Sequence, residues 1–242
     1  MRYAIISDIH SNLEALNAVL EALKAESIDE YISLGDVVGY GADPMKCLDI
    51  IRELKPKFTI AGNHDRGTTG QFAIGRFNEW ARDAIRWTQK AVDEEALNYL
   101  RTFNMTEEAS GATFVHGSLE SPEDFNYIVN IEDAYRAINI AKTDIVFVGH
   151  SHCPEAYIFG DGLNRHIRDK VIEIEEAKGY IINVGSVGQP RDRDNRASCA
   201  VYDTDRGLVE IKRISYNIES AAAKILEAGL PHFLAERLAS GR

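Results

Sequence analysis

Five short apolar runs, each followed closely by residues of metal-binding types, constrain the fold of this chain most strongly. The runs cover residues 3–6, 31–34, 58–60, 113–115 and 145–148. Each is rich in β-branched and aromatic residues and too short for a helix, so each predicts a buried strand. The residues behind them are Asp8-Ile9-His10, Gly35-Asp36, Gly62-Asn63-His64-Asp65, His116 and Gly149-His150-Ser151-His152. Because ligand sites in layered α/β folds gather outside the carboxyl ends of strands, these five loops predict one shared pocket that holds two metal ions.

Composition narrows the classes of protein that fit this pattern. A chain of 242 residues without a linker-like stretch fits one domain, residues 1–242. The net charge of −11 argues against an extended nucleic-acid surface, which is normally basic. Three cysteines without a CxxC pair read as reduced intracellular thiols. No signal pattern and no apolar run of membrane-spanning length is present, so a cytoplasmic location without membrane attachment is expected.

The order of predicted elements is strand–helix alternation, then a helical insertion, then a strand-rich half. Ser11 and Glu14 read as a capping box that opens the first helix, and Asp43-Pro44 opens the second. Residues 66–103 interrupt the alternation with a loop at 67–75 and helices at 76–91 and 93–102. A helix at 131–141 interrupts the later strands. Residues 217–239 predict two C-terminal helices separated by Gly229 and Pro231.

The residue types at these loops suit two divalent ions of the first transition row, which imidazole and carboxylate bind well together. The predicted ligands are Asp8, His10, Asp36, Asn63, His116, His150 and His152. Asp36 is suited to bridge both ions, and Asn63 adds an oxygen without adding charge. Two ions a few ångströms apart clamp the attacking and leaving oxygens of an in-line displacement at phosphorus, and a hydroxide between them is a strong nucleophile.

His64 is predicted to act as the general acid. A leaving alkoxide needs a proton, and a histidine poised near neutral pH can donate one. Asp65 is expected to accept from the other ring nitrogen of His64 and so to fix its tautomer.

Taken together, these motifs resemble the calcineurin-like metallophosphoesterase superfamily, particularly its small bacterial and archaeal members. They occur in that family's order over residues 8–152, and Asn183-Val184-Gly185-Ser186-Val187-Gly188 looks like its late Gly-Ser segment. The resemblance implies two mixed β-sheets packed as a sandwich with helices on the outer faces. It also implies one metal held by Asp8, His10, Asp36 and His152, and a second held by Asp36, Asn63, His116 and His150, with His64 as the acid.

Two departures from the family pattern bear on the substrate. The turn after Asp36 reads Val37-Val38-Gly39-Tyr40-Gly41 and lacks the phosphate-gripping Arg found in protein phosphatases and symmetrical dinucleoside tetraphosphatases. Arg66 or Arg191 could take its place as a guanidinium clamp, and Asn12 and Tyr40 flank the clusters as further candidate phosphate contacts. The second departure is that this chain has both His64 and a helical insertion, which many of the smallest members lack. The insertion could be a lid over the substrate or simply core packing, and its amphipathic spacing favours packing.

We therefore expect a metal-dependent phosphoesterase that hydrolyses a phosphodiester or phosphomonoester, either a small molecule or a nucleotide, by attack of a metal-bridging hydroxide. Mn²⁺ or Fe is the first expectation for the cofactor, with Zn²⁺, Ni²⁺ or Co²⁺ as alternatives. Within the enzymes, the alternatives are a nucleotide-polyphosphate hydrolase, a protein phosphatase and a nuclease. The alternative from another class is a metal-binding scaffold or regulatory protein of the same fold. A homo-oligomer stays open, since the C-terminal helices could form a dimer face.

Overall fold

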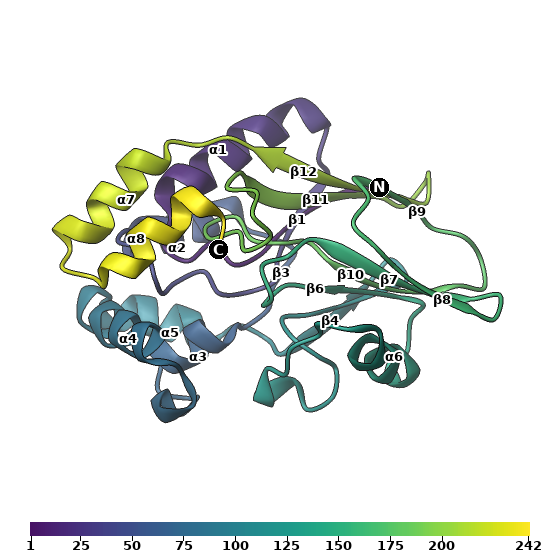
Figure 1. The fold of residues 1–242 in the computed structure, drawn as a ribbon, viewed down its shortest axis with the longest axis horizontal. Helices are drawn as coiled ribbons and strands as arrows, with labels where there is room; N and C mark the ends of the chain where they lie inside the picture. Colours follow the sequence, from purple (N-terminus) through teal and green to yellow (C-terminus); the bar gives the residue numbers. More distant parts are fainter.

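A computed structural model describes residues 1–242 as two six-stranded mixed sheets with helices around them (Figure 1). The first sheet has the strand order β3-β2-β1-β11-β12-β9. Its parallel half consists of β1 (Arg2–Ile6), β2 (Glu30–Ser33) and β3 (Phe58–Thr59). Its antiparallel half consists of β11 (Ala197–Asp203), β12 (Leu208–Ile214) and β9 (Val171–Glu173).

The second sheet has the order β4-β5-β6-β10-β7-β8. Its parallel centre consists of β5 (Ala112–Val115), β6 (Ile145–Val148) and β10 (Gly179–Asn183). Antiparallel strands flank this centre: β4 (Thr106–Ala109) on one side, and β7 (Glu155–Gly160) with β8 (Leu163–Ile167) on the other. In both sheets, therefore, the strands that precede the metal-binding residue types run parallel, and their carboxyl ends lie on one side.

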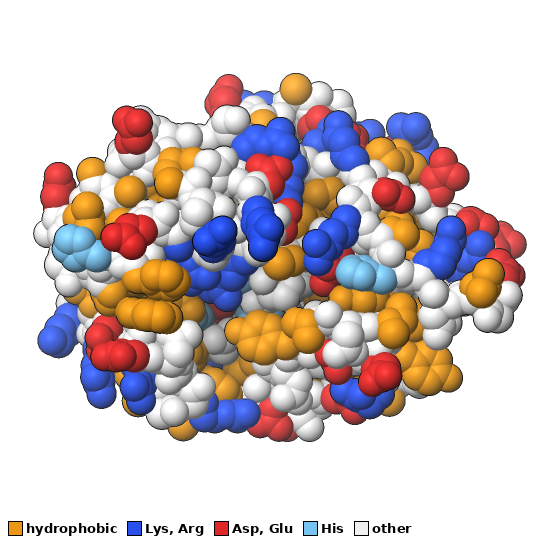
Figure 2. All heavy atoms as spheres, in the orientation of Figure 1, with side chains coloured by type: hydrophobic (Ala, Val, Ile, Leu, Met, Phe, Trp, Pro, Cys, Tyr) orange, Lys and Arg blue, Asp and Glu red, His pale blue; other side chains and the backbone are white.

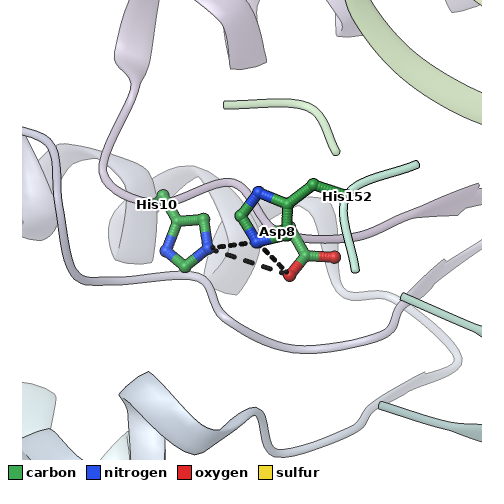
Figure 3. A group of neighbouring side chains, drawn as sticks. All are labelled: Asp8, His10 and His152. Carbon is green, nitrogen blue, oxygen red and sulfur yellow. Dashed lines mark hydrogen bonds and ion pairs between the residues drawn. The ribbon is translucent and has the colours of Figure 1, made fainter. Parts of the chain in front are cut away.

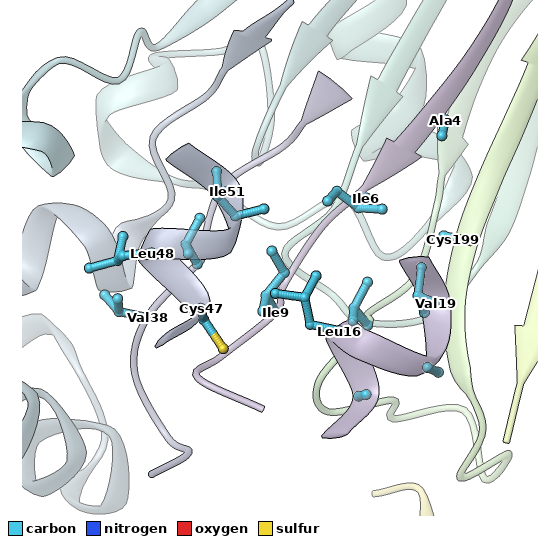
Figure 4. Close-up of a cluster of buried hydrophobic side chains, with 14 of the residues drawn as sticks. Ala4, Ile6, Ile9, Leu16, Val19, Val38, Cys47, Leu48, Ile51 and Cys199 are labelled. Carbon is cyan, nitrogen blue, oxygen red and sulfur yellow. The ribbon is translucent and has the colours of Figure 1, made fainter. Parts of the chain in front are cut away.

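The two-residue period of β1 shows how the sheets pack. Tyr3 and Ile5 belong to the core between the sheets, together with Phe114 and Phe147 of the second sheet. The alternate residues, Ala4 and Ile6, face the helices outside instead (Figure 4). Both faces of the strand are buried, which explains why its sequence is a continuous apolar run. The predicted sandwich of two mixed sheets with outer helices is confirmed.

The outer helices fall into three groups. The helices α1 (Leu13–Leu23), α2 (Pro44–Leu54) and α5 (Glu94–Arg101) bury apolar residues in the cluster on the outer face of the first sheet. The helix α6 (Ile131–Ile140) covers the second sheet. The helix α4 (Glu79–Ala91) packs with α7 (Ile218–Glu227) and α8 (His232–Ser240) around an apolar cluster of its own. Three short 3-10 turns complete the set: η1 (Lys24–Glu26), η2 (Ile74–Arg76) and η3 (Pro122–Asp124).

Packing between the insertion and the C-terminal helices is tight. The ring of Trp80 on α4 stacks on Phe233 of α8 with centroids 4.2 Å apart. Tyr40 and Phe77 lie in the same apolar cluster, so this group of helices reaches the loop behind Asp36. No helix of the chain is both long and apolar enough to cross a lipid bilayer.

One predicted helix start differs from the structure, and one short helix was not predicted. The first helix is capped by Asn12, whose side-chain oxygen accepts the N–H of Ala15 at 3.1 Å. The predicted capping box is wrong, because Ser11 adopts a left-handed backbone with φ of 53° and Glu14 pairs with Lys224. In addition, residues 63–68 form a short helix, α3 (Asn63–Thr68), where a loop was expected from residue 67.

Candidate functional site

The predicted metal ligands converge from both sheets. Asp8 and His10 follow β1, Asp36 follows β2, and Asn63 begins α3 after a short connection from β3. His116 follows β5, and His150 and His152 follow β6. All seven side chains are buried, with exposed fractions between 0 and 8%. The carboxyl ends of the parallel strands thus bring residues as far apart in sequence as 8 and 152 into one site.

The first group of ligand atoms comes from Asp8, His10 and His152 (Figure 3). The Nε2 atoms of His10 and His152 lie 3.1 Å apart, and Nε2 of His152 lies 3.2 Å from Oδ1 of Asp8. Oδ2 of Asp36 lies 3.6 Å from Nε2 of His10. Two ligand atoms bound to one first-row ion at about 2.1 Å lie about 3.0–3.4 Å apart, so these spacings suit a shared ion.

A second group adjoins the first through Asp36. Oδ2 of Asp36 lies 3.4 Å from Nε2 of His116, and the ligand atoms of Asp36, His116 and His150 all lie within 4.8 Å of one another. The side-chain oxygen of Asn63 is buried without a hydrogen-bond partner. Asp36 is therefore the carboxylate placed to face both groups.

Backbone carbonyls orient three of the imidazole rings. The Nδ1 atoms of His10, His116 and His152 lie 3.1, 2.7 and 2.6 Å from the carbonyl oxygens of Val38, Leu34 and Gln189 respectively. A carbonyl only accepts, so each Nδ1 carries a proton and each Nε2 points into the pocket.

Each of the two ligand carboxylates, Asp8 and Asp36, accepts hydrogen bonds through only one of its oxygens. Oδ2 of Asp8 accepts from Oγ of Ser7 at 2.6 Å and from the backbone N–H of His150 at 3.0 Å. Oδ1 of Asp36 accepts the backbone N–H of His64 at 2.8 Å. The second oxygen of each carboxylate faces the histidines.

Four ligand atoms are buried with no hydrogen-bond partner: Oδ1 of Asp8, Oδ1 of Asn63, and Nε2 of His116 and His150. A buried polar atom without a partner costs about 1–3 kcal/mol, so this concentration of them in one pocket requires an explanation. Divalent cations would satisfy all of these lone pairs at once. The residues present therefore fit a pair of ions.

The backbone around the ligands is strained in a pattern that matches this role. Asp8, His10, Asp36, His150 and His152 have positive φ angles of 53°, 48°, 52°, 65° and 62°. Non-glycine residues seldom adopt this left-handed conformation, which costs energy and clusters at functional sites. The strain turns side chains two residues apart toward the same pocket.

Electrostatics keep most ligands in the protonation state that metals require. Burial lowers the pKa values of His10, His150 and His152, so these rings are neutral at pH 7. Burial also lowers the pKa of His116, but Asp36 and Asp8 outweigh it and raise that pKa to about 9. His116 thus carries a proton on the side that faces Asp8 and Asp36. A metal ion bound at this place would displace that proton.

Comparison with known proteins identifies the family. The family model of the calcineurin-like phosphoesterase superfamily domain matches residues 1–207. The chain belongs to this superfamily.

Relatives match over nearly the whole chain. An uncharacterised protein of Methanocaldococcus jannaschii is 40% identical over 245 aligned positions, which cover 99% of this chain and 98% of that protein. The crystal structure of a metallophosphoesterase from Sphaerobacter thermophilus is 39% identical with a TM-score of 0.87, and covers 100% of this chain and 99% of its own. A hypothetical protein from Pyrococcus horikoshii shares the fold at 20% identity with a TM-score of 0.82, over 100% of this chain and 98% of its own.

His64, the acid expected from the superfamily pattern, lies at the edge of the site. Its ring packs against His10 and Tyr40, with centroid distances of 4.8 and 4.3 Å. Nδ1 is buried without a partner against Gly39, where an added Cβ would collide with the ring. Burial, and then Arg191 and other histidines, lower the pKa of His64 to about 4, although Asp36 opposes this. Among these protein groups the ring is neutral at pH 7, so the expectation of a histidine poised near neutrality is corrected.

Asp65 does not contact the His64 ring as predicted. Its carboxylate instead accepts four backbone N–H groups, from Asp36 and Gly62 on one oxygen and from Val37 and Val38 on the other, at 2.8–3.3 Å. Asp65 sits at the third position of α3 and caps that helix. It therefore holds the loop of Asp36 against the loop of Asn63.

Two of the predicted phosphate contacts are also corrected. The guanidinium of Arg66 donates to the carbonyl of Phe103 at 2.7 Å and to the side chain of Gln71, away from the site. The amide of Asn12 accepts at the helix cap with its oxygen and donates to the carbonyl of Gly188 at 2.8 Å, so it serves the local structure.

The other two predicted contacts lie at the site. Tyr40 packs on the rings of His10 and His64. The guanidinium of Arg191 lies over the Tyr40 ring, 5.6 Å from its centroid, and donates to Gln189. Arg191 has no carboxylate within ion-pair distance, so its charge is available to an anion.

Some residues of the site gave no recognisable signal in the sequence. Tyr127 stacks on the His150 ring with centroids 3.8 Å apart, yet it lies in an irregular segment that carries no motif. Arg237 comes from α8, and its pKa is lowered to about 10 by burial and then by the neighbouring Arg191. Only the spatial proximity of the C-terminal helix to the site reveals it.

Proposed function

We propose that this chain is a dinuclear metal-dependent phosphoesterase that hydrolyses a phosphodiester or phosphomonoester. The observation that carries the proposal is the set of four buried, unpartnered ligand atoms where the loops of both sheets meet. Membership of the superfamily supports the same reaction class. A carboxylate, imidazole and amide set of this kind suits Mn²⁺ or Fe, with Zn²⁺, Ni²⁺ or Co²⁺ as alternatives.

Two overlapping sets of ligands would hold the ions. Asp8, His10, Asp36 and His152 form one set. Asp36, Asn63, His116 and His150 form the other. When bound, two such ions lower the pKa of water and withdraw negative charge from phosphoryl oxygens.

The chain's own residues then bind and orient the ester. Arg191 contributes a guanidinium without a carboxylate partner, which suits a phosphoryl oxygen that is not being displaced. His64 presents Nε2 to the pocket, because its Nδ1 is buried against Gly39. A phosphate anion next to the ring opposes the lowering of its pKa, and in that state Nε2–H can donate to the leaving oxygen. Tyr40 packs on both rings and limits their rotation.

The test is hydrolysis of bis(p-nitrophenyl) phosphate and p-nitrophenyl phosphate by protein stripped of metal and reloaded with Mn²⁺. Turnover that depends on the ion is the expected result, and the ratio of the two rates separates a diesterase from a monoesterase. Two bound ions with no turnover of either ester, nor of a broader panel of phosphoesters, would contradict the proposal and favour a non-catalytic metal-binding protein.

Two variants separate the roles of the site residues. His64→Ala should retain both ions and lose kcat, most strongly for substrates with poor leaving groups, because the missing group is a proton donor. Loss of the ions in that variant would show that the role of His64 is misassigned. Asp36→Asn should weaken both ions together, and full occupancy by two ions would refute the bridging role.

A further inference from the structure

A pocket with a volume of about 390 Å³ opens beside the predicted ligands and is lined by His64, Asn63 and His150 at its inner end. This volume lies within the range of about 300–1,000 Å³ that is typical of small-molecule sites. The far walls come from the helical insertion and from residues 124–127. On the face shown in Figure 2, apolar side chains lie on both sides of a central recess. The pocket is therefore continuous with the proposed reaction centre and extends beyond what a phosphoryl group alone would fill.

Aromatic rings form a continuous wall of this pocket. The Phe77 ring lies 5.2 Å from that of His64, and Phe72 meets Phe77 edge-on at 5.4 Å. Phe72 also meets Phe125 edge-on at 5.1 Å. Tyr127 also lines the pocket, stacks on His150 and is 51% exposed. Aromatic walls of this kind favour a planar ring, which can stack or meet an edge.

Two amides add polar recognition to the same pocket. Asn78 uses its side-chain oxygen to accept the N–H of Ala81 at 2.9 Å, which leaves its NH₂ group without a protein acceptor. Asn126 uses its NH₂ group to donate to the carbonyl of Glu120 at 3.2 Å, which leaves its side-chain oxygen without a donor. Both residues line the pocket. The pocket thus offers one donor and one acceptor, which match a ring with hydrogen-bonding edges better than a purely apolar ring.

An ion pair joins the two walls. Nη1 of Arg76 on η2 lies 2.8 Å from Oδ1 of Asp124 on η3, and the Arg76 guanidinium also lies over the Phe72 ring at 4.6 Å. Both side chains are about half exposed. This pair links the insertion to the loop that carries Tyr127.

We propose that this pocket binds the nucleobase of a nucleotide, so that the substrate of the site is a nucleotide phosphoester. The assignment rests on the proposed phosphoesterase function, because the phosphate must lie at the ligands while the base lies between Tyr127 and the Phe72–Phe77 wall. The helical insertion then has a binding role as well as a packing role.

Equilibrium binding to the Mn²⁺-loaded full chain, measured by titration calorimetry, tests the pocket independently of turnover. The probes are adenosine 5′-monophosphate, ribose 5-phosphate and phenyl phosphate. Base stacking on an aromatic side chain is worth about 1–3 kcal/mol, so the nucleotide should bind at least about fivefold more tightly than ribose 5-phosphate. Tyr127→Ala and Phe72→Ala should reduce that ratio to near one. Tyr135→Ala is the matched control, because Tyr135 is 50% exposed on α6 and lies outside the pocket.

Each outcome bears on the pocket separately from the reaction. An affinity ratio near one in the unmodified chain contradicts the proposal that the pocket binds a nucleobase, even if esters are hydrolysed. If the affinity ratio persists in both variants with Mn²⁺ content unchanged, Tyr127 and Phe72 are not the residues that bind the base. Phenyl phosphate that binds as tightly as the nucleotide overturns the choice of a nucleobase. A high ratio without hydrolysis of any ester supports the pocket and contradicts the phosphoesterase.

Discussion

Gly149→Ala should weaken metal binding, although Gly149 is not itself a predicted ligand. A Cβ built on Gly149 would lie 2.5 Å from Oδ2 of Asp8 and closer still to Oγ of Ser7. The backbone of Gly149 is not in the left-handed region, so alanine meets no conformational penalty there. The effect is therefore the collision of one methyl group with Ser7 and with the carboxylate of Asp8, a predicted ligand of the first ion.

The magnitude follows from these contacts. An ordinary Cβ contact begins at 3.4 Å, so the separation from Asp8 must grow by about 0.9 Å and that from Ser7 by about 1.3 Å. Overpacking of this kind costs about 1–3 kcal/mol of folding free energy. Moving Oδ2 also strains its bonds from Ser7 and from the N–H of His150, and the loss of such supporting contacts typically lowers metal affinity about 10–100-fold.

The assay is Mn²⁺ titration of the metal-stripped chain by calorimetry, together with urea unfolding. Gly75→Ala is the matched control, because a Cβ at Gly75 meets nothing within 4 Å and the residue has no positive φ. We expect wild-type affinity for the control and at least about tenfold weaker binding for Gly149→Ala. If Gly149→Ala binds two ions with unchanged affinity, the assigned role of the Asp8 carboxylate is wrong.

Three further predictions concern stability. Burial lowers the pKa of His64 from 6.5 to about 4, so neutral His64 stabilises the fold above pH 6.5 and this stability is lost as the pH falls through 4. Between pH 7 and pH 3, the free energy of unfolding measured in urea with EDTA should therefore fall by about 3 kcal/mol more for the wild type than for His64→Gln. Equal decreases in the two proteins would refute the lowered pKa of His64. Leu48→Ala empties a fully buried position on α2 and should cost about 2–5 kcal/mol, whereas Leu226→Ala, 44% exposed on α7, should cost below about 0.5 kcal/mol; similar values for both would contradict the packing. Free Mn²⁺ at about 100 times its Kd should raise the unfolding free energy by about 2.7 kcal/mol per ion, and no rise in the thermal midpoint would count against a built metal site.

Much of the fold could be predicted from the sequence because two signals coincide in it. Runs such as residues 145–148 are apolar on both faces of the strand, and each is followed by polar residue types that have no use in a core. This pairing predicted both the buried strands and the strand ends at which the candidate ligands meet. The helix starts at Asn130 and Asp43 were also predictable from local features, since Asn130 caps its helix with its side chain and Pro44 suits the first helical position after Asp43.

The failures share a physical cause, which is competition between local and tertiary hydrogen bonds. Ser11 and Glu14 satisfy the local rule for a capping box, but the turn at His10 and Ser11 forces the cap onto Asn12. Asp65 neighbours His64 in sequence, yet the four N–H groups of two other loop segments compete for its carboxylate. Such competition depends on which loops meet, and that information is absent from spacing along the chain.

The pocket walls were unpredictable for a different reason. Phe72 and Tyr127 lie in irregular segments 55 residues apart, and neither belongs to a periodic pattern. Only the docking of the insertion beside residues 122–127 brings them into the same pocket. The proposed base-binding pocket is therefore encoded in the connections of the chain, whereas the candidate metal site is encoded at its strand ends.

The division of the predicted ligands between two sheets has a consequence for how this site could arise or be transplanted. Asp8 and Asp36 belong to the first sheet, and His116, His150 and His152 belong to the second. Neither half of the sandwich contains a full set of ligands for either ion. A loop graft or a duplicated half-fold could not reproduce the centre, and recombination would have to exchange both sheets as one unit. An ion bound there would also tie the two sheets together, so that separating them would require losing the ion first.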